Sequence, residues 1–138
     1  MTAGDILHHT DFTFHDGVKG EKLLVVLNDP DLKKGEPYLV IRTTSRLKGK
    51  EMQPGCLAGW RVFYCVPTKG EFFDRPTVLQ LDDMYELNIS TVLRDGLQHS
   101  LKQIGQLSDL LLRQLKNCIK QIKEDISEKH YEMIFRKH

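Results

Sequence analysis

Short apolar runs separated by turn-forming residues fill the first two-thirds of the chain. Residues 22–27 and 36–44 are rich in aliphatic and β-branched side chains, which predicts a buried strand at 22–27 and a further strand at 36–44. Glycine, proline and charged residues bound these runs, as expected where a chain turns. After a first segment at 5–14 that mixes apolar and polar residues, further strands are predicted at 60–66, 77–81 and 100–107.

The last third of the chain has the periodicity of a helix. Ser108 is a predicted N-cap, and one helical face after it is apolar, with Leu111, Leu115, Cys118, Ile119, Ile122 and Ile126. We therefore expect an amphipathic helix of about five turns at 108–127 that packs on the sheet. The charged tail at 128–138 is expected to fray, although its apolar residues could dock, namely Tyr131, Met133, Ile134 and Phe135.

The order of these elements predicts a mainly β fold with a C-terminal helix. Strands this short, separated by turns, favour a small barrel or a strongly bent antiparallel sheet over a parallel α/β layer. The 138 residues suffice for one domain with its own core, with strands at about 4–107 and the helix behind them. A polar segment at 45–55 is expected to be an exposed loop.

Charge and cysteine content narrow the function classes. The chain has 20 Lys and Arg against 19 Asp and Glu, so disorder and a histone-like tail are disfavoured, and any nucleic-acid site must be a local patch. Cys56, Cys65 and Cys118 are odd in number and widely spaced, which predicts neither a disulfide framework nor a zinc site. The N-terminal residues are too polar for a signal peptide, and no apolar run reaches the ~18 residues of a membrane span. A soluble, reduced, cytoplasmic protein is the expectation.

Two loops concentrate bases and hydrogen-bond donors. The first covers residues 15–22. The second contains Arg42, Thr43, Thr44, Ser45, Arg46, Lys48 and Lys50. Guanidinium groups pair with phosphate oxygens and hydroxyls add short hydrogen bonds, so the second loop suits a phosphodiester. The alternative is a pair of ordinary strand threonines followed by a solvated basic loop.

His15 is the best candidate for a general acid or base. It stands in a turn beside Asp16, and imidazole titrates near neutral pH. The alternative is an exposed turn histidine without a role. His8 and His9 are neighbours in a strand, so their side chains point to opposite faces and cannot chelate one ion together.

Two further positions have both a structural and a chemical interpretation. Asp82, beside Asp83 at a predicted strand end, is either part of a turn or a carboxylate site. Cys56 follows a glycine in a loop and is either inert or a reactive thiol, although no nearby group in the sequence favours its thiolate. Cys65 and Cys118 are expected to be small buried apolar residues.

Six short segments also follow one another in a recognisable order. They are residues 4–7, the turn at 16–17, residues 23–29, 40–44 and 77–82, and the C-terminal amphipathic helix. This order resembles the PemK/MazF family, the toxin halves of bacterial toxin–antitoxin pairs, over about residues 4–126. The resemblance implies an SH3-like barrel with a C-terminal helix, usually a homodimer, neutralised by a small antitoxin protein. It also implies metal-independent cleavage of single-stranded RNA, without a cofactor, by attack of the ribose 2′-hydroxyl on its own phosphodiester.

The catalytic positions of the family are matched in part. Its Arg-Pro pair before the second strand reads Glu21-Lys22 here, and Lys22 supplies a cation without the bidentate contact of a guanidinium. The family's strand-end hydroxyl corresponds to Thr43 or Thr44, with Thr43 favoured by register. His15 lies near the loop histidine that some members use.

The Arg-x-Asp element of some members reads Gln80-Leu81-Asp82, which keeps the carboxylate and loses the arginine. Arg42, on the neighbouring strand, is a candidate replacement. The hypothesis is an RNA-cleaving site with His15, Lys22, Thr43, Thr44 and Asp82 as catalytic residues. Its RNA-binding residues would be Arg42, Arg46, Lys48 and Lys50.

Two other functions stay open. One is an inactive SH3-like barrel that binds a protein partner or a nucleic acid, and the other is an enzyme that uses Cys56. The nuclease would act on single-stranded RNA and bind an antitoxin, whereas the inactive barrel would bind a protein or a nucleic acid. A membrane is not expected as a partner in any of these cases. A homodimer is expected from the resemblance and from three apolar residues near predicted loops, Trp60, Phe72 and Phe73. The alternative for each of these three is a place in the core.

Overall fold

The computed structural model describes residues 1–45 and 53–136, and its strands form one seven-stranded antiparallel sheet. In sheet order these are β4 (Gly55–Leu57), β5 (Val62–Cys65), β6 (Thr77–Leu87), β3 (Tyr38–Thr44), β2 (Lys19–Val26), β1 (Asp5–Thr13) and β7 (Leu101–Gln106). The helices are α1 (Ile89–Leu97), α2 (Asp109–Gln121) and α3 (Glu128–Phe135). The mainly β class with a C-terminal helix is confirmed. Within the described residues β4 and β7 are edge strands, so the sheet is open.

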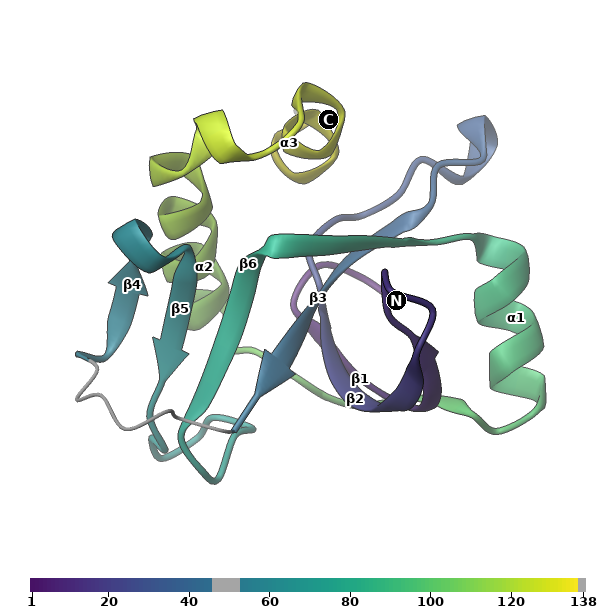
Figure 1. Ribbon diagram of the computed structural model, residues 1–138, viewed down its shortest axis with the longest axis horizontal. Coiled ribbons are helices and arrows are strands. Elements are labelled where there is room, and N and C mark those ends of the chain that lie inside the picture. The colour runs from purple at the N-terminus through teal and green to yellow at the C-terminus, as the bar shows by residue number, and fades with distance from the viewer. Residues whose placement is uncertain (46–52, 137–138) are drawn as a thin grey trace.

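Strand β6 is longer than predicted and bends midway (Figure 1). Its pairing with β3 shifts between the pairs Ile41–Met84 and Thr43–Leu79, so extra residues of β6 bulge out of the ladder. Asp82 and Asp83 lie in this bulge. The prediction of a strand that ends in an Asp82-Asp83 turn is therefore wrong, because the bulge accommodates both aspartates and the strand continues.

The bent sheet has a hydrophobic cluster on each face. Helices α2 and α3 cover the first cluster, to which Val25 of β2 belongs. Its neighbours Leu24 and Val26 belong to the second cluster, because successive side chains of a strand point to opposite faces. Residues Ile89 and Val92 of α1 pack against that second cluster.

Both C-terminal helices begin at a serine. The Ser108 hydroxyl accepts a hydrogen bond from the Leu111 N–H at 3.1 Å, which confirms the predicted N-cap of α2. The helix is shorter than the expected five turns, because the backbone leaves the helical conformation at Ile122 and continues in a 3₁₀ turn. Ser127 caps α3 in the same way, and Met133 and Ile134 of this helix are buried. As far as Arg136, the tail therefore docks on the sheet instead of fraying.

Two elements were missed in the sequence. Helix α1 has only nine residues, and two of its apolar side chains, Leu93 and Leu97, are exposed. Strand β4 has only three residues and lies at the end of the segment predicted to be a loop. None of the described helices combines the length and the apolar composition that a membrane span requires.

A disulfide joins Cys56 of β4 to Cys118 of α2, with the two Cα atoms 5.3 Å apart. The prediction of no disulfide is wrong, because wide spacing along the chain does not show which strand and helix pack together. Cys56 therefore presents no thiol while this bond is intact, which removes it as a nucleophile in this state. Cys65 is free and buried, as predicted, and burial raises the pKa of its thiol to about 12.

The apolar residues expected at a dimer contact differ in exposure. Trp60 is 50% exposed and Phe72 is 36% exposed, whereas Phe73 is a core residue with 5% exposure. For Phe73 the core alternative therefore holds, because the loop that carries it folds onto the first cluster.

Candidate functional site

A cavity of about 480 Å³ lies between the end of β3, strands β1 and β2, and the loop that leads into β6. We call it the strand-end cavity. Lys22, Thr43 and Thr44, three residues of the predicted catalytic set, line it. The other lining residues are His8, Glu21, Leu23, Ser45, Phe72, Phe73, Asp74, Arg75 and Thr77.

Side chains join β2 to β3 at this cavity. The pairing of the two strands runs from Val26–Val40 to Leu24–Arg42. Beyond it, the Thr43 hydroxyl donates a hydrogen bond to the Leu23 carbonyl oxygen, and Lys22 Nζ donates one to the Thr43 carbonyl oxygen, each at 3.0 Å. The strand ends are therefore held together by the residues that the sequence placed in the active site.

These contacts separate the roles of the two threonines. Thr43 is 5% exposed and its hydroxyl proton is engaged with the backbone, so this residue shapes the wall of the cavity. Thr44 is the last residue of β3 and Ser45 follows it, and both are less buried than Thr43. Of these three hydroxyl residues, Thr44 and Ser45 are therefore the more accessible to a solute in the cavity.

The histidine at this cavity is His8, which the sequence analysis did not select. Its Nε2 lies 3.1 Å from Oε1 of Glu21, and 29% of its side chain is exposed. A carboxylate beside Nε2 favours the tautomer that carries its proton on this nitrogen, in which Nδ1 is the proton acceptor. The sequence signal that could have pointed to His8 is strand alternation. It places His8 and His9 on opposite faces of the strand, so the two histidines have different surroundings.

The loop before β6 supplies an aromatic ring and a further cation. Phe72 makes an edge-to-face contact with Phe73, with ring centroids 5.5 Å apart. Arg75 Nε lies 3.8 Å from Oδ1 of the neighbouring Asp74, and both side chains are largely exposed. No sequence signal pointed to this loop, because its position depends on the core residue Phe73.

The remaining predicted residues gather elsewhere. Nε2 of His15 lies 3.3 Å from Oδ1 of Asp83, and Nε of Arg42 lies 2.5 Å from Oδ2 of the same carboxylate. The His15 ring also stacks on Tyr85 at 3.8 Å. Arg42 precedes Thr43 on β3, so its side chain points to the opposite face from that of Thr43, and it pairs with Asp83 instead of lining the strand-end cavity.

Asp82 lines a smaller cavity of about 230 Å³ together with His15, Asp83, Asp125 and His130. Three of these five side chains are carboxylates. Such a cavity repels a phosphodiester more than the strand-end cavity does, whose lining has two cations, Lys22 and Arg75, as well as two carboxylates, Glu21 and Asp74. Arg46, Lys48 and Lys50, the other predicted RNA-binding residues, lie outside the described residues.

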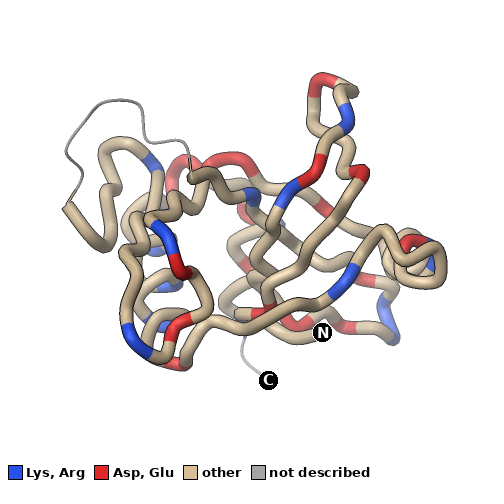
Figure 2. The backbone as a smooth tube through the Cα atoms, turned by 90° about the horizontal axis from the view of Figure 1, so that it is seen from below, with Lys and Arg blue, Asp and Glu red and all other residues tan. Residues whose placement is uncertain are grey.

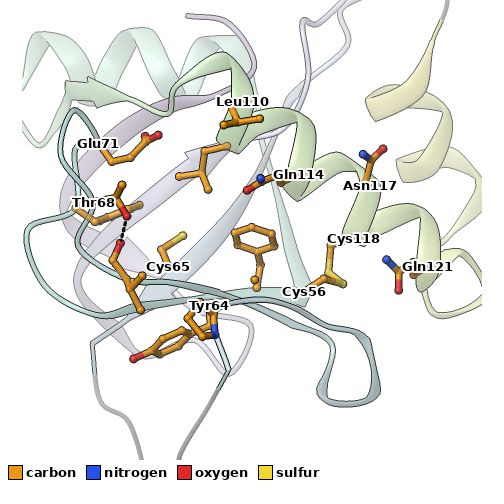
Figure 3. A pocket seen from close by; sticks show the side chains of 16 residues that line it. Cys56, Tyr64, Cys65, Thr68, Glu71, Leu110, Gln114, Asn117, Cys118 and Gln121 are labelled. Carbon is orange, nitrogen blue, oxygen red and sulfur yellow. Dashed lines mark hydrogen bonds between the residues drawn. A yellow bond between two sulfur atoms is a disulfide. The ribbon is translucent and has the colours of Figure 1, made fainter.

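A third cavity, of about 570 Å³, lies between α2 and the strands β4 and β5 (Figure 3). The disulfide forms part of its wall, and the Cys65 side chain also lines it. Its one charged lining residue, Glu71, accepts hydrogen bonds from the backbone N–H and hydroxyl of Ser108. This cavity therefore offers apolar and amide groups but no free charge for acid–base chemistry.

Metal chemistry has no obvious location in the part of the chain that the structure describes. No group of three or more His, Cys, Asp and Glu side chains there is arranged to hold a metal ion.

Basic and acidic positions are intermixed along the backbone (Figure 2). A ligand that carries negative charge must consequently be recognised by a few individual cations.

Comparisons with known proteins add no family name. No protein-family model matches the chain, and no curated protein is similar to it in sequence. The geometry of the strand-end cavity must therefore carry any functional conclusion.

Proposed function

We propose that the chain is an endoribonuclease that cleaves single-stranded RNA at the strand-end cavity without a metal ion. The observation that supports this most is the His8–Glu21 pair in one cavity with Lys22, Arg75 and the hydroxyl residues of β3. A base, cations and hydroxyl donors are the groups that transfer of a phosphodiester to its own 2′-hydroxyl requires.

Each group has a part in the proposed reaction. His8 Nδ1 takes the proton of the 2′-hydroxyl, whose oxygen forms a bond to phosphorus. The bond from phosphorus to the 5′-oxygen breaks, and that oxygen takes a proton from solvent. Lys22 and Arg75 offset the charge on the phosphate oxygens, and the product ends in a 2′,3′-cyclic phosphate.

The site differs from the one expected from the sequence in its base. The alternative base, His15, lies beside Asp82, Asp83 and Asp125, and Asp83 also pairs with Arg42. A phosphate there would meet three carboxylates. Charge therefore favours His8 over His15.

The test is cleavage of a mixed-sequence single-stranded RNA in the presence of a chelator, with detection of cyclic-phosphate ends. His8→Gln is expected to lower the rate at least about 100-fold, because it removes the general base. His99→Asn, at an exposed turn with positive φ that Asn tolerates, is the matched control and should retain the rate.

Two outcomes would contradict this proposal. One is the absence of cyclic-phosphate products with the unaltered protein. The other is a rate that His15→Gln abolishes and His8→Gln leaves unchanged, which would move the reaction to the cavity beside Asp82.

In a cell, the proposal makes the chain a toxin-like enzyme of the PemK/MazF type, with the bent sheet as a form of its SH3-like barrel. We expect a cytoplasmic homodimer that a small antitoxin protein restrains. Growth arrest on expression, relieved by an acidic protein encoded beside the gene, would support this role. Light scattering measures the oligomeric state.

A second candidate is a module that binds RNA or a protein without catalysis. It is favoured by the contacts of Thr43 and Lys22, whose polar atoms bind backbone carbonyl oxygens. RNA binding that persists without cleavage, and that Thr43→Ala and Lys22→Ala leave unchanged, would establish this alternative.

A further inference from the structure

Phe72 is an aromatic side chain in an unusual setting for an exposed loop. It lies in the wall of the strand-end cavity, in the loop between β5 and β6, and it remains 36% exposed. Its edge-to-face contact with the buried Phe73 fixes the orientation of the ring. The exposed part of the ring is thus held in place by the core.

A glycine of β7 allows this position. A Cβ atom added at Gly105 would lie 2.3 Å from Cδ2 and 2.8 Å from Cε2 of Phe72. No side chain can occupy this space while the ring stays where it is, so the ring packs directly on the backbone of β7. Gly105 pairs with Ile6 of β1, two residues before His8. The ring and the proposed base are therefore held by the same three-stranded part of the sheet.

From this placement we propose that Phe72 is a stacking platform for one nucleobase of the bound RNA and that Gly105 positions it. The inference rests on the proposed function, because it assigns a base-binding position to the same cavity. An aromatic ring in a cavity with Lys22 and Arg75 offers a nucleotide both contacts it needs, a surface for the base and cations for the phosphate. Stacking tolerates every base, so Phe72 sets the position of the strand and not its sequence.

A stacking platform and a simple anchor of the loop need different properties of the Phe72 side chain. An anchor needs the ring only for its volume, and leucine supplies most of that volume in contact with Gly105. A platform needs the flat face, which leucine lacks and tryptophan has. The two roles therefore differ in their response to aliphatic and aromatic replacements.

The experiment measures binding of a fluorescent 2′-O-methyl oligonucleotide, which cannot be cleaved because its 2′-oxygen is blocked. A set of oligonucleotides, each with one abasic position, is compared with the full strand. With the unaltered protein, one abasic position is expected to weaken binding by about 5- to 150-fold, the range for loss of one stacked base. Phe72→Leu should weaken binding of the full strand by the same factor and leave the affinity for that abasic strand unchanged.

Two further variants make the assignment specific. Phe72→Trp should keep the preference for the full strand over the abasic one. Gly105→Ala should reduce this preference, because the added methyl group displaces the ring. Thermal unfolding of each variant identifies any that fails to fold. For the folded variants, unchanged affinity for the abasic strand shows that the rest of the binding site is intact.

The outcomes distinguish the inference from the function on which it rests. If the unaltered protein binds no oligonucleotide even at low salt, the proposed function fails, and the inference fails with it. If it binds and Phe72→Leu affects both strands equally or neither, the inference alone is overturned. Loss of self-association in Phe72→Leu would instead assign the ring to a contact between two copies and would also overturn it.

Discussion

His9 and Asp95 form a buried pair that joins β1 to α1. Nε2 of His9 lies 2.9 Å from Oδ2 of Asp95, and Nδ1 accepts the N–H of Asp11 at 3.0 Å. Both ring nitrogens are thus satisfied, which makes this histidine structural. Burial alone would raise the pKa of Asp95, but hydrogen bonds from His9 and Arg94 outweigh it and lower the pKa below its ordinary value.

Asp95→Ala is expected to lower the free energy of unfolding by about 1–3 kcal/mol at pH 7, because it leaves His9 buried without an acceptor. Since the folded state depresses the pKa of Asp95, its contribution is present above the pKa of a free aspartate and disappears as the pH falls through the lower folded value. Urea denaturation at several pH values measures this difference. Asp11→Ala, which removes an exposed carboxylate near Lys19, is the control and should cost little. An equal cost for both variants would contradict the buried role.

Strand alternation shows what the sequence could predict at the scale of single residues. It separated His8 from His9, and the structure places them in different surroundings. The same alternation separates Arg42 from Thr43, which the hypothesis of an RNA-cleaving site combined. The partner of His9 is 86 residues away in the sequence, so no local pattern reveals it.

Helix α3 is held to the sheet by charges as well as by its apolar side. Nε2 of His130 lies 2.7 Å and Nζ of Lys129 lies 3.1 Å from Oε2 of Glu86 on β6. At the other end of the helix, Arg136 pairs with Glu36. The hydrogen bond from His130, stronger in effect than the partial burial that opposes it, holds the pKa of Glu86 below its ordinary value.

Glu86→Gln should loosen the start of α3 at neutral pH, with a cost below about 1 kcal/mol because the pair is partly exposed. The pKa of Glu86 is lower in the folded state, so this contribution holds above the pKa of a free glutamate and vanishes as the pH falls through the folded value. Hydrogen exchange of the α3 amides, compared at neutral and acid pH, measures it. Glu124→Gln, in the exposed 3₁₀ turn, should leave exchange unchanged. Identical exchange for both variants at neutral pH would contradict the role of Glu86.

Elements with strong periodicity were predictable, and elements that depend on distant contacts were not. The Ser108 cap and the apolar face of α2 are local signals, and both are present. Strand β6 passes through Asp82 and Asp83 because β3 supports both halves around a bulge. Helix α3 forms within the charged C-terminal segment because Met133 and Ile134 pack into the first hydrophobic cluster. In each of these two cases tertiary contacts outweigh a local turn or polar signal.

The disulfide acts on the whole molecule. It joins residues 62 apart in the sequence, so it restricts the unfolded chain over almost half of its length. For a loop of this size, closure stabilises the folded state by about 4 kcal/mol when the entropy of the unfolded chain dominates. Reduction of the bond with a dithiol should therefore lower the free energy of unfolding by about this amount.

Urea denaturation with and without the dithiol measures this effect. The variant Cys56→Ser with Cys118→Ser should match the reduced protein and should not respond to the reductant. Cys65→Ser, which leaves the bond in place, should keep the response. A response that persists in the double variant, or none in the unaltered protein, would contradict the prediction. Because disulfides are rare in reducing compartments, activity is best compared in both redox states.

The same bond determines how the molecule bears tension. When the molecule unfolds under a force applied to its two termini, tension passes from Cys56 to Cys118 through the sulfur atoms, so the unfolded chain that formed β5, β6, α1 and β7 is not stretched. At the ~3.6 Å that an extended residue spans, the 62-residue separation hides about 220 Å of contour length. The oxidised chain can therefore be drawn out to little more than half its full reach, and one covalent bond sets that limit.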